Sequence, residues 1–322
     1  MQKQVPFSIQ EEFIEFEKQY FAFFQNKHKC VGEILHHLVT SHGKCLRPTM
    51  LLLSAAMNGK INRKTYLIAT IIELLHLSSL VHDDVIDNAC LRRNKPTLNA
   101  IWNNKISVLT GDYLISKCLQ VLCEINDAFL FTYFGDLVEQ MSEGELIQLS
   151  KINDYSLTED EYYRIIEAKT ANLFAACLYL GAYSTSPSAD DLHRFCLIGK
   201  EIGLAFQIKD DLKDYKVNLK EKDFAKDIKE HIITLPLIHA LNNMPTSEKQ
   251  VLIDLYRIEE KSEQQVLQIM HIVECYQGII YAESVIEQKV KHALALLELS
   301  KASSYKKSLI EIISQLSLTR VH

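Results

Sequence analysis

The chain has 322 residues, of which only 10 are Gly and 6 are Pro, roughly half the average use of about 7% and 5%. All-β sandwiches and barrels need these residues at many tight turns, and neither GxGxxG nor GxxxxGK occurs, so we exclude such folds and glycine-rich phosphate loops. With 41 acidic against 35 basic residues, the net charge of −6 gives no electrostatic reason to expect nucleic acid or an anionic membrane as a partner.

The cysteines and the hydropathy pattern indicate a reduced, cytoplasmic protein. The eight cysteines form no CxxC pair and no zinc spacing with His, so we expect them to be reduced and mostly buried. The first ten residues contain no apolar signal core. No uninterrupted apolar run approaches the ~20 residues of a membrane span, so we expect no transmembrane segment.

The hydrophobic periodicity predicts helices along the whole chain. In chain order they cover residues 11–24, 29–41, a segment from Pro48, 62–88, 105–125, 129–151, 158–183, 188–219, 233–241, 247–257 and three stretches to residue 316. Asn62, Thr158 and Ser247 are expected to cap three of them. Residues 91–96 and 214–232 read as loops. We therefore predict one all-α domain over residues 1–322.

An acidic motif, Asp83-Asp84-Val-Ile-Asp87, ends the most apolar of these helices. Asp83 and Asp87 are four residues apart and share one helix face, where like charges repel. The C-terminal end of a helix also disfavours carboxylates. A solvated helix end is the plain alternative, but a divalent cation removes both penalties, and carboxylate oxygens suit Mg²⁺ rather than zinc.

A second copy of this motif, Asp210-Asp211-Leu-Lys-Asp214, follows another mostly apolar helix. Gln207 lies on the same stripe. Gly199 and Gly203 form a small-xxx-small pair that predicts close packing of this helix against a neighbour. Two such motifs predict two carboxylate clusters that hold Mg²⁺ ions around one diphosphate.

Basic residues in three places complete the predicted anion site. Lys44 and Arg47 lie at a helix start, where backbone N–H groups favour anions. Arg92-Arg93 follows the first acidic motif. Lys169-Thr170 lies in an apolar helix with no adjacent acidic residue, which is unusual for a lysine on a buried face. Each element alone is equally well explained as surface charge, but together they indicate two phosphate-bearing ligands.

With these motifs the chain resembles the trans-type prenyl diphosphate synthases of the polyprenyl synthetase family, above all the bacterial medium- and long-chain enzymes. The resemblance covers nearly the whole chain, through GKxxRP, ELLHLSSLVHDDVIDNACLRR, WNNKISVLTGDYL, QMSEGELIQL, KTANLFAACLYLGA, AFQIKDDLKDY and ITLPLIHAL. It implies the all-α isoprenoid synthase fold around a deep central cavity, usually as a homodimer. It also implies an Mg²⁺-dependent prenyltransferase that joins isopentenyl diphosphate to an allylic diphosphate.

The resemblance also assigns roles to individual residues. It assigns isopentenyl diphosphate binding to Lys44, Arg47, His76 and Arg93. It assigns allylic diphosphate binding to Arg92, Lys169, Thr170, Gln207 and Lys222. It assigns catalysis to Asp83, Asp84, Asp87, Asp210, Asp211 and Lys169. For the metal, it implies two Mg²⁺ ions on Asp83 and Asp87 and a third on Asp210, with Asp214 in support.

Two positions depart from the family pattern. Ile232 stands where a diphosphate-binding lysine is expected, so one contact is missing unless Lys226 or Lys229 replaces it. Asn94 stands where the family usually has a glycine after the arginine pair. Asparagine tolerates left-handed backbone geometry, so this change is harmless.

Product length is predicted from residues just before the first acidic motif. Short-chain members often carry an aromatic residue there, whereas this chain has Ser78 and Ser79, which leave the cavity open. We therefore expect a product above twenty carbons, although Leu75 and deeper residues could stop it earlier. The alternatives are a short-chain geranylgeranyl or farnesyl synthase, a terpene cyclase or head-to-head synthase, and a non-catalytic subunit of a heteromeric synthase. Two intact acidic motifs argue against the cyclase and the non-catalytic subunit.

Overall fold

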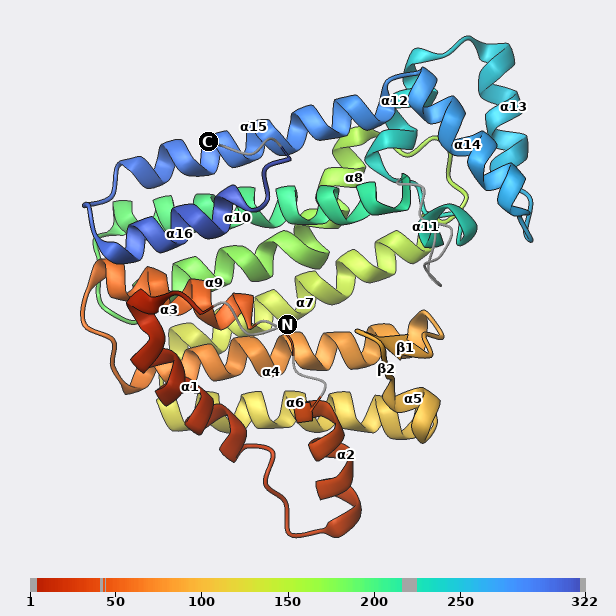
Figure 1. Ribbon diagram of the computed structural model, residues 1–322. Helices are drawn as coiled ribbons and strands as arrows, with labels where there is room; N and C mark the ends of the chain where they lie inside the picture. The colour runs from red at the N-terminus through yellow and green to blue at the C-terminus, as the bar shows by residue number, and fades with distance from the viewer. Residues whose placement is uncertain (1–4, 41–42, 44, 216–224, 319–322) are drawn as a thin grey trace. The chain divides into compact units, whose positions relative to one another are not determined.

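The computed structural model describes residues 5–40, 43, 45–215 and 225–318, and almost all of its regular structure is helical (Figure 1). The prediction of an all-α protein is therefore confirmed. The chain forms two compact units, and each unit draws on separate stretches of sequence. The prediction of one domain over residues 1–322 stays a prediction.

The first unit comprises residues 1–134, 176–195 and 300–309. Its elements are η1 (Phe7–Ile9), α1 (Gln10–Ala22), α2 (Lys29–Thr40), α3 (Leu46–Asn58), α4 (Arg63–Ile86), β1 (Leu91–Arg92), β2 (Lys95–Pro96), α5 (Leu98–Ile101) and α6 (Asn104–Ile125). It also contains the first residues of α7 (Ala128–Ser150), α10 (Ala189–Asp211) and α16 (Ser304–Ser314) and the last residues of α9 (Asn172–Tyr183).

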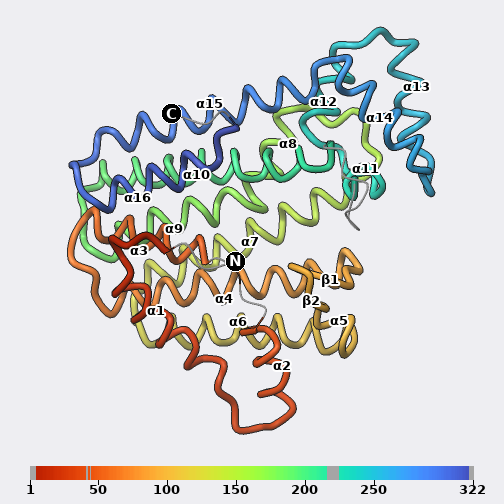
Figure 2. Tube along the Cα trace, viewed as in Figure 1, coloured from red at the N-terminus to blue at the C-terminus, as the bar shows by residue number. Residues whose placement is uncertain are grey.

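Helix α4 is the centre of this unit because most of its surface is apolar. It packs against α1, α3, α5 and α6, and Figure 1 shows α4 and α6 running side by side. Asn62 caps its N-terminus in a reciprocal box with Thr65, as the sequence predicts. After α4 the chain turns into the short β1–β2 hairpin, which can be followed along the trace in Figure 2.

The second unit comprises residues 135–175, 196–299 and 310–322. Beside its parts of the helices already named, its elements are α8 (Glu159–Ile166), the π-helical turn η2 (Glu167–Ala171), η3 (Leu212–Tyr215), α11 (Lys226–Lys229), α12 (Leu235–Asn243), α13 (Thr246–Tyr256), α14 (Glu263–Cys275) and α15 (Gly278–Glu298). Helix α12 packs against α8, α14 and α15, and its apolar face is buried there.

Three local predictions can be compared with the structure. Thr158 caps α8 in a box with Glu161, as predicted. The prediction for Ser247 is wrong: α13 begins at Thr246, its cap is Pro245, and Ser247 lies inside the helix. The prediction that most cysteines are buried is also wrong, because Cys30, Cys90, Cys123 and Cys275 are exposed, although all eight are free thiols.

Two helices, α4 and α6, are long and apolar enough by length and composition to cross a membrane. Of their apolar windows, 67% in α4 and 39% in α6 is buried inside the protein. Burial in the core of the first unit therefore accounts for the apolar composition of α4.

Candidate active site

The first acidic motif forms the last turn of α4. Asp83 lies in the helix and Asp87 is its C-terminal capping residue, and both side chains are half-buried. Asp84 between them is buried, and its Oδ1 accepts a hydrogen bond from Nε of Arg92 at 2.7 Å. The guanidinium of Arg92 therefore compensates the charge of the one carboxylate in this motif that the fold removes from water.

The hairpin after α4 presents the arginine pair. Its two turn residues, Arg93 and Asn94, have φ values of 54° and 61°. Two consecutive left-handed residues are the geometry of a two-residue hairpin turn, and Asn94 adopts it at little cost, as predicted. The guanidinium of Arg93 lies against Gly43, close to where a side chain at that position would be. The fold thus brings Arg93 to the GKxxRP segment.

Arg47 and His76 are both half-buried, and they contact each other close enough to Arg93 for its charge to act on His76. Nη1 of Arg47 lies 2.9 Å from Nε2 of His76. Since a guanidinium has only donors, the imidazole Nε2 must accept, so His76 is neutral with its proton on Nδ1. Burial and the nearby charges of Arg47 and Arg93 hold the pKa of His76 well below its usual range. Burial also lowers the pKa of Arg47, which the buried Glu73 opposes.

The side chains predicted to set product length lie on α4 in the same unit. Leu75 and Ser78 are buried, and the Ser78 hydroxyl donates to the carbonyl of Gly111 on α6 at 2.9 Å. The Ser79 hydroxyl donates to the carbonyl of His76 at 2.9 Å. Both hydroxyls are thus satisfied by backbone carbonyls, which lets serine occupy this apolar helix.

The second acidic motif spans the end of α10 and η3. Asp210 is exposed and pairs with Lys213, while Asp211 is buried and Asp214 half-buried. Burial is the main cause that raises the pKa values of Asp211 and Asp214 to about 6. Asp227 from α11 adds a fourth carboxyl, whose pKa burial and these neighbours raise well above its usual range, and its backbone N–H donates to Asp214.

Lys169 and Thr170 lie in η2, where the helix makes one π turn between α8 and α9. Such turns change the direction of side chains within a helix and are frequent at functional sites. Lys169, which has no adjacent acidic residue in the sequence, has an acidic partner from another part of the chain. Its Nζ lies 2.6 Å from Oε2 of Glu145, which a tertiary contact brings from α7.

Thr170 reaches the second acidic motif through Gln207. The hydroxyl of Thr170 donates to Oε1 of Gln207 at 2.7 Å, and Nε2 of Gln207 donates to Oδ1 of Asp211 at 2.8 Å. The predicted close packing of α10 explains this contact. A Cβ on Gly203 would lie 2.5 Å from the Cα of Ala171, so only glycine allows α10 this near to η2.

The carboxylates of the two acidic motifs fit Mg²⁺ better than a metal ion whose ligands all come from the protein. Among the residues that the structure describes, no three His, Cys, Asp or Glu side chains converge on one metal position. Mg²⁺ is usually held by one or two carboxylates and completes its shell with water and substrate phosphates. Asp83 with Asp87, and Asp210 with Asp214, are pairs of this kind, and each member is exposed or half-buried.

The comparisons with known proteins agree with this chemistry. Residues 28–273 match the family model for polyprenyl synthetase. The chain belongs to the polyprenyl synthetase family. It is 35% identical over 298 residues to the all-trans-nonaprenyl-diphosphate synthase (geranyl-diphosphate specific) of Rhodobacter capsulatus, which covers 90% of this chain and 89% of that protein.

Two solved structures of the family share the fold. A decaprenyl diphosphate synthase from Rhodobacter capsulatus superposes with a TM-score of 0.90 at 26% identity and covers 96% of each chain. A polyprenyl synthase from Caulobacter crescentus CB15, complexed with calcium and isoprenyl diphosphate, has a TM-score of 0.89 at 27% identity over 97% of this chain and 96% of that one. This chain is accordingly a prenyltransferase with the isoprenoid synthase fold, and its relatives include medium- and long-chain polyprenyl diphosphate synthases.

The structure brings most of the predicted site residues into two groups, one in each unit. In the first unit, Asp84 pairs with Arg92, Arg47 contacts His76, and Arg92 and Arg93 act electrostatically on His76. In the second unit, hydrogen bonds join Thr170, Gln207 and Asp211, and Lys169 acts electrostatically on Asp211. Lys44 and Lys222 lie outside the described residues. Lys226 and Lys229, the candidates to replace the lysine missing at Ile232, both act electrostatically on Asp214.

Three residues at this site were missed by the sequence analysis: Asp227, whose contact with Asp214 is given above, Glu145 and Tyr162. Glu145 pairs with Lys169, and the hydroxyl of the buried Tyr162 donates to Oδ2 of Asp211 at 2.6 Å. Glu145 lies in the QMSEGELIQL segment, and the resemblance of this segment to the family was a signal that could have pointed to it. Tyr162 had no such signal, because it is one apolar position of a helix among many.

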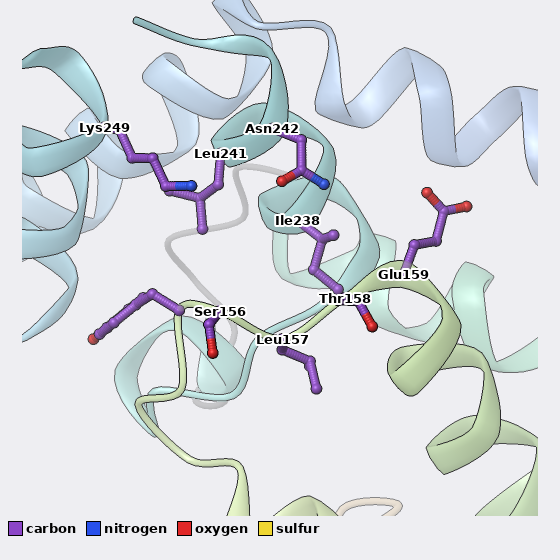
Figure 3. Close-up of a pocket in the computed structure, with 9 residues that line it drawn as sticks. Ser156, Leu157, Thr158, Glu159, Ile238, Leu241, Asn242 and Lys249 are labelled. Atoms are coloured by element: carbon purple, nitrogen blue, oxygen red, sulfur yellow. The ribbon is translucent and has the colours of Figure 1, made fainter. Parts of the chain in front are cut away.

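A pocket of about 310 Å³ in the second unit contains none of the predicted site residues. Figure 3 shows Lys249 and Asn242 at one edge and Ser156 to Glu159 at the other. Since it contains no acidic motif and no arginine, its lining does not fit a metal–diphosphate ligand.

Proposed function

We propose that this chain condenses isopentenyl diphosphate with an allylic diphosphate, in the presence of Mg²⁺, to make a trans-polyprenyl diphosphate of more than twenty carbons. The observation that carries the proposal is the contact of Arg47 with a neutral His76 beside Arg93. Two guanidiniums held together with a neutral partner leave a net positive, partly desolvated cluster that suits a diphosphate. Arg47, His76 and Arg93, with Lys44, are assigned to isopentenyl diphosphate.

We assign allylic diphosphate binding to Lys169, Thr170 and Gln207 of the second unit. We also assign it to Arg92 and Lys222. Asp83 and Asp87 would hold two Mg²⁺ ions, and Asp210, supported by Asp214, a third. Bound Mg²⁺ would neutralise the negative charge of the departing diphosphate. Lys226 and Lys229, near Asp214, would supply the positive charge that Ile232 lacks.

The reaction breaks the allylic C–O bond and forms a C–C bond from the alkene of isopentenyl diphosphate. The lysine and arginine side chains stabilise the departing diphosphate, so that positive charge develops on the allylic carbon. One proton is then lost. Nε2 of the neutral His76 already accepts a hydrogen bond from Arg47, so we assign proton acceptance to the released diphosphate rather than to a side chain.

The test is a product assay on the purified chain alone, with Mg²⁺, radiolabelled isopentenyl diphosphate and either geranyl or farnesyl diphosphate as primer. We expect products longer than twenty carbons, because serine at positions 78 and 79 presents no aromatic barrier. A product of only twenty carbons would contradict the assigned length. No turnover with either primer would favour a non-catalytic subunit.

We further propose that the protein is a cytoplasmic homodimer. Exposed Val108 and Leu119 lie eleven residues apart on one face of α6, and Leu109, 64% exposed, lies beside them. A second copy covering this face would explain why an apolar helix remains largely uncovered. Eight free thiols suit a reducing compartment. Light scattering should show a dimer, and Leu119→Glu should give monomers, whereas Val251→Glu on α13 should leave the dimer intact.

A further inference from the structure

Tyr162 of α8 touches the second acidic motif without belonging to any predicted ligand set. Its side chain is buried, with 3% of its surface exposed, and its hydroxyl donates to Oδ2 of Asp211 at 2.6 Å. The other carboxylate oxygen of Asp211 accepts from Nε2 of Gln207 at 2.8 Å. Both oxygens of this buried carboxylate therefore hold a neutral donor.

This pair of hydrogen bonds fixes the amide of Gln207. With its nitrogen directed to Asp211, its oxygen is directed to Thr170, whose hydroxyl donates to it at 2.7 Å. A flipped amide would set its oxygen against the Asp211 carboxylate oxygen, two acceptors with no hydrogen between them, whereas the Thr170 hydroxyl could accept from either orientation. The chain Tyr162–Asp211–Gln207–Thr170 thus joins α8, α10 and η2 inside the second unit, and η2 also carries Lys169.

We propose that Tyr162 is a positioning residue for the allylic diphosphate: by holding Asp211 it orients Gln207 and Thr170 toward that ligand. The proposal rests on the assignment of Gln207 and Thr170 to the allylic substrate made above. Asp211 in this arrangement is the centre of a hydrogen-bond network, whereas the exposed Asp210 and the half-buried Asp214 are the carboxylates assigned above to Mg²⁺.

The test compares Tyr162→Phe with wild type in steady-state kinetics and in calorimetric binding of farnesyl thiolodiphosphate, an unreactive allylic analogue, with Mg²⁺ present. The variant should raise the KM for the allylic substrate and the Kd of the analogue by about tenfold, the size of one lost hydrogen bond to a charged group. The KM for isopentenyl diphosphate should stay within about twofold, because none of Tyr162, Asp211, Gln207 and Thr170 is assigned to that ligand. A structural role would lower Tm and leave the ratio of the two KM values unchanged.

Tyr163→Phe is the matched control, since Tyr163 is the next residue of α8, is half-buried and interacts with Glu159 rather than with Asp211. It should leave both KM values unchanged. If Tyr162 acts through Asp211, Tyr162→Phe should add little to Asp211→Asn in a double-mutant cycle. Should Tyr162→Phe fail to fold, Thr170→Val removes the donor at the other end of the chain and should raise the same KM.

The outcomes separate this proposal from the proposed function. Wild-type protein that binds the analogue but forms no product would overturn the function and leave the positioning role testable by binding. Active wild-type protein, together with a Tyr162→Phe variant that binds the analogue as tightly as wild type, would overturn the positioning role.

Discussion

The two acidic motifs have the same sequence pattern, and the fold gives them different electrostatics. In the first motif the buried middle carboxylate, Asp84, pairs with the guanidinium of Arg92 at 2.7 Å. In the second motif the corresponding Asp211 receives only neutral donors, from Tyr162 and Gln207. A charged partner compensates the cost of removing a carboxylate from water, whereas neutral donors compensate it only in part, so burial raises the pKa of Asp211 to about 6.

The two motifs therefore differ in how their negative charge is compensated. In the first motif the buried carboxylate has a cationic partner within the protein. In the second motif, burial and repulsion from neighbouring carboxylates raise the pKa values of Asp211, Asp214 and Asp227. A bound cation would oppose this repulsion. The same sequence motif therefore lies in two different electrostatic environments.

The largest expected effect comes from removing a carboxylate that we assign to Mg²⁺. Asp83→Ala should reduce kcat by about a thousandfold or more, the cost of losing charge stabilisation in the transition state. Its Tm should hardly change, because Asp83 is half-buried at the helix end that disfavours negative charge. Product formation and differential scanning fluorimetry measure the two quantities. A large fall in Tm with proportionate loss of activity would mean that Asp83 serves the fold.

Two glycines that lie close to neighbouring atoms, one near each motif, should lose different amounts of stability when replaced by alanine. A Cβ on Gly144 would lie 2.8 Å from the backbone nitrogen of Lys169, whereas one on Gly111 would lie 2.1 Å from the ring of His82, a side chain that can rotate. We expect Gly144→Ala to destabilise the protein by about 2 to 3 kcal/mol and Gly111→Ala by about 1 kcal/mol. Urea unfolding measures both. Equal losses of stability would mean that the η2 backbone moves as easily as the His82 ring.

Breaking the ion pair of the first motif should be costly in a way that has no equivalent in the second. Arg92→Ala leaves the buried Asp84 without its guanidinium partner and should cost about 1 to 2 kcal/mol, between the values for exposed and buried pairs. Asp84→Asn in the same chain should recover part of this loss. If the double variant is no more stable than Arg92→Ala, charge compensation is not the role of Arg92.

The smallest effect is a pH dependence confined to the second motif. The pKa values of Asp211 and Asp214 are raised to about 6, so the metal-free folded protein binds more protons than the unfolded chain between about pH 4 and pH 6. These groups therefore stabilise the fold fully below pH 4, and this contribution is lost as pH rises through 6. Asp214→Asn should remove the contribution of Asp214 to this pH dependence. The unfolding free energy of the metal-free variant minus that of wild type should therefore be about 1 kcal/mol higher at pH 7.5 than at pH 4.

Urea unfolding in a chelating agent at both pH values measures this difference, and added Mg²⁺ should stabilise wild type more than Asp214→Asn. The matched substitution in the first motif, Asp87→Asn, provides the control for a general effect of acidic residues on stability. A variant difference that is the same at pH 4 and pH 7.5 would contradict the effect of burial on Asp214.

The sequence by itself was sufficient for the helices, the two acidic motifs, the arginine pair and the close packing of Gly203. These features depend on residues a few positions apart, where helical periodicity, capping boxes and left-handed asparagine act locally. The error at Ser247 has the same origin: a polar residue near a helix start resembles a cap, but Pro245 is the cap and the helix begins at Thr246.

Only the tertiary structure decided which partners these residues have. Lys169 meets Glu145 from 24 positions earlier, Arg47 meets His76, and Tyr162 meets Asp211 from 49 positions away. Such contacts depend on how helices pack, and a single sequence carries no local signal for them. The protonation of His76 and the raised pKa values of Asp211 and Asp214 follow from the same packing, because burial and neighbouring charges, rather than residue type, set them.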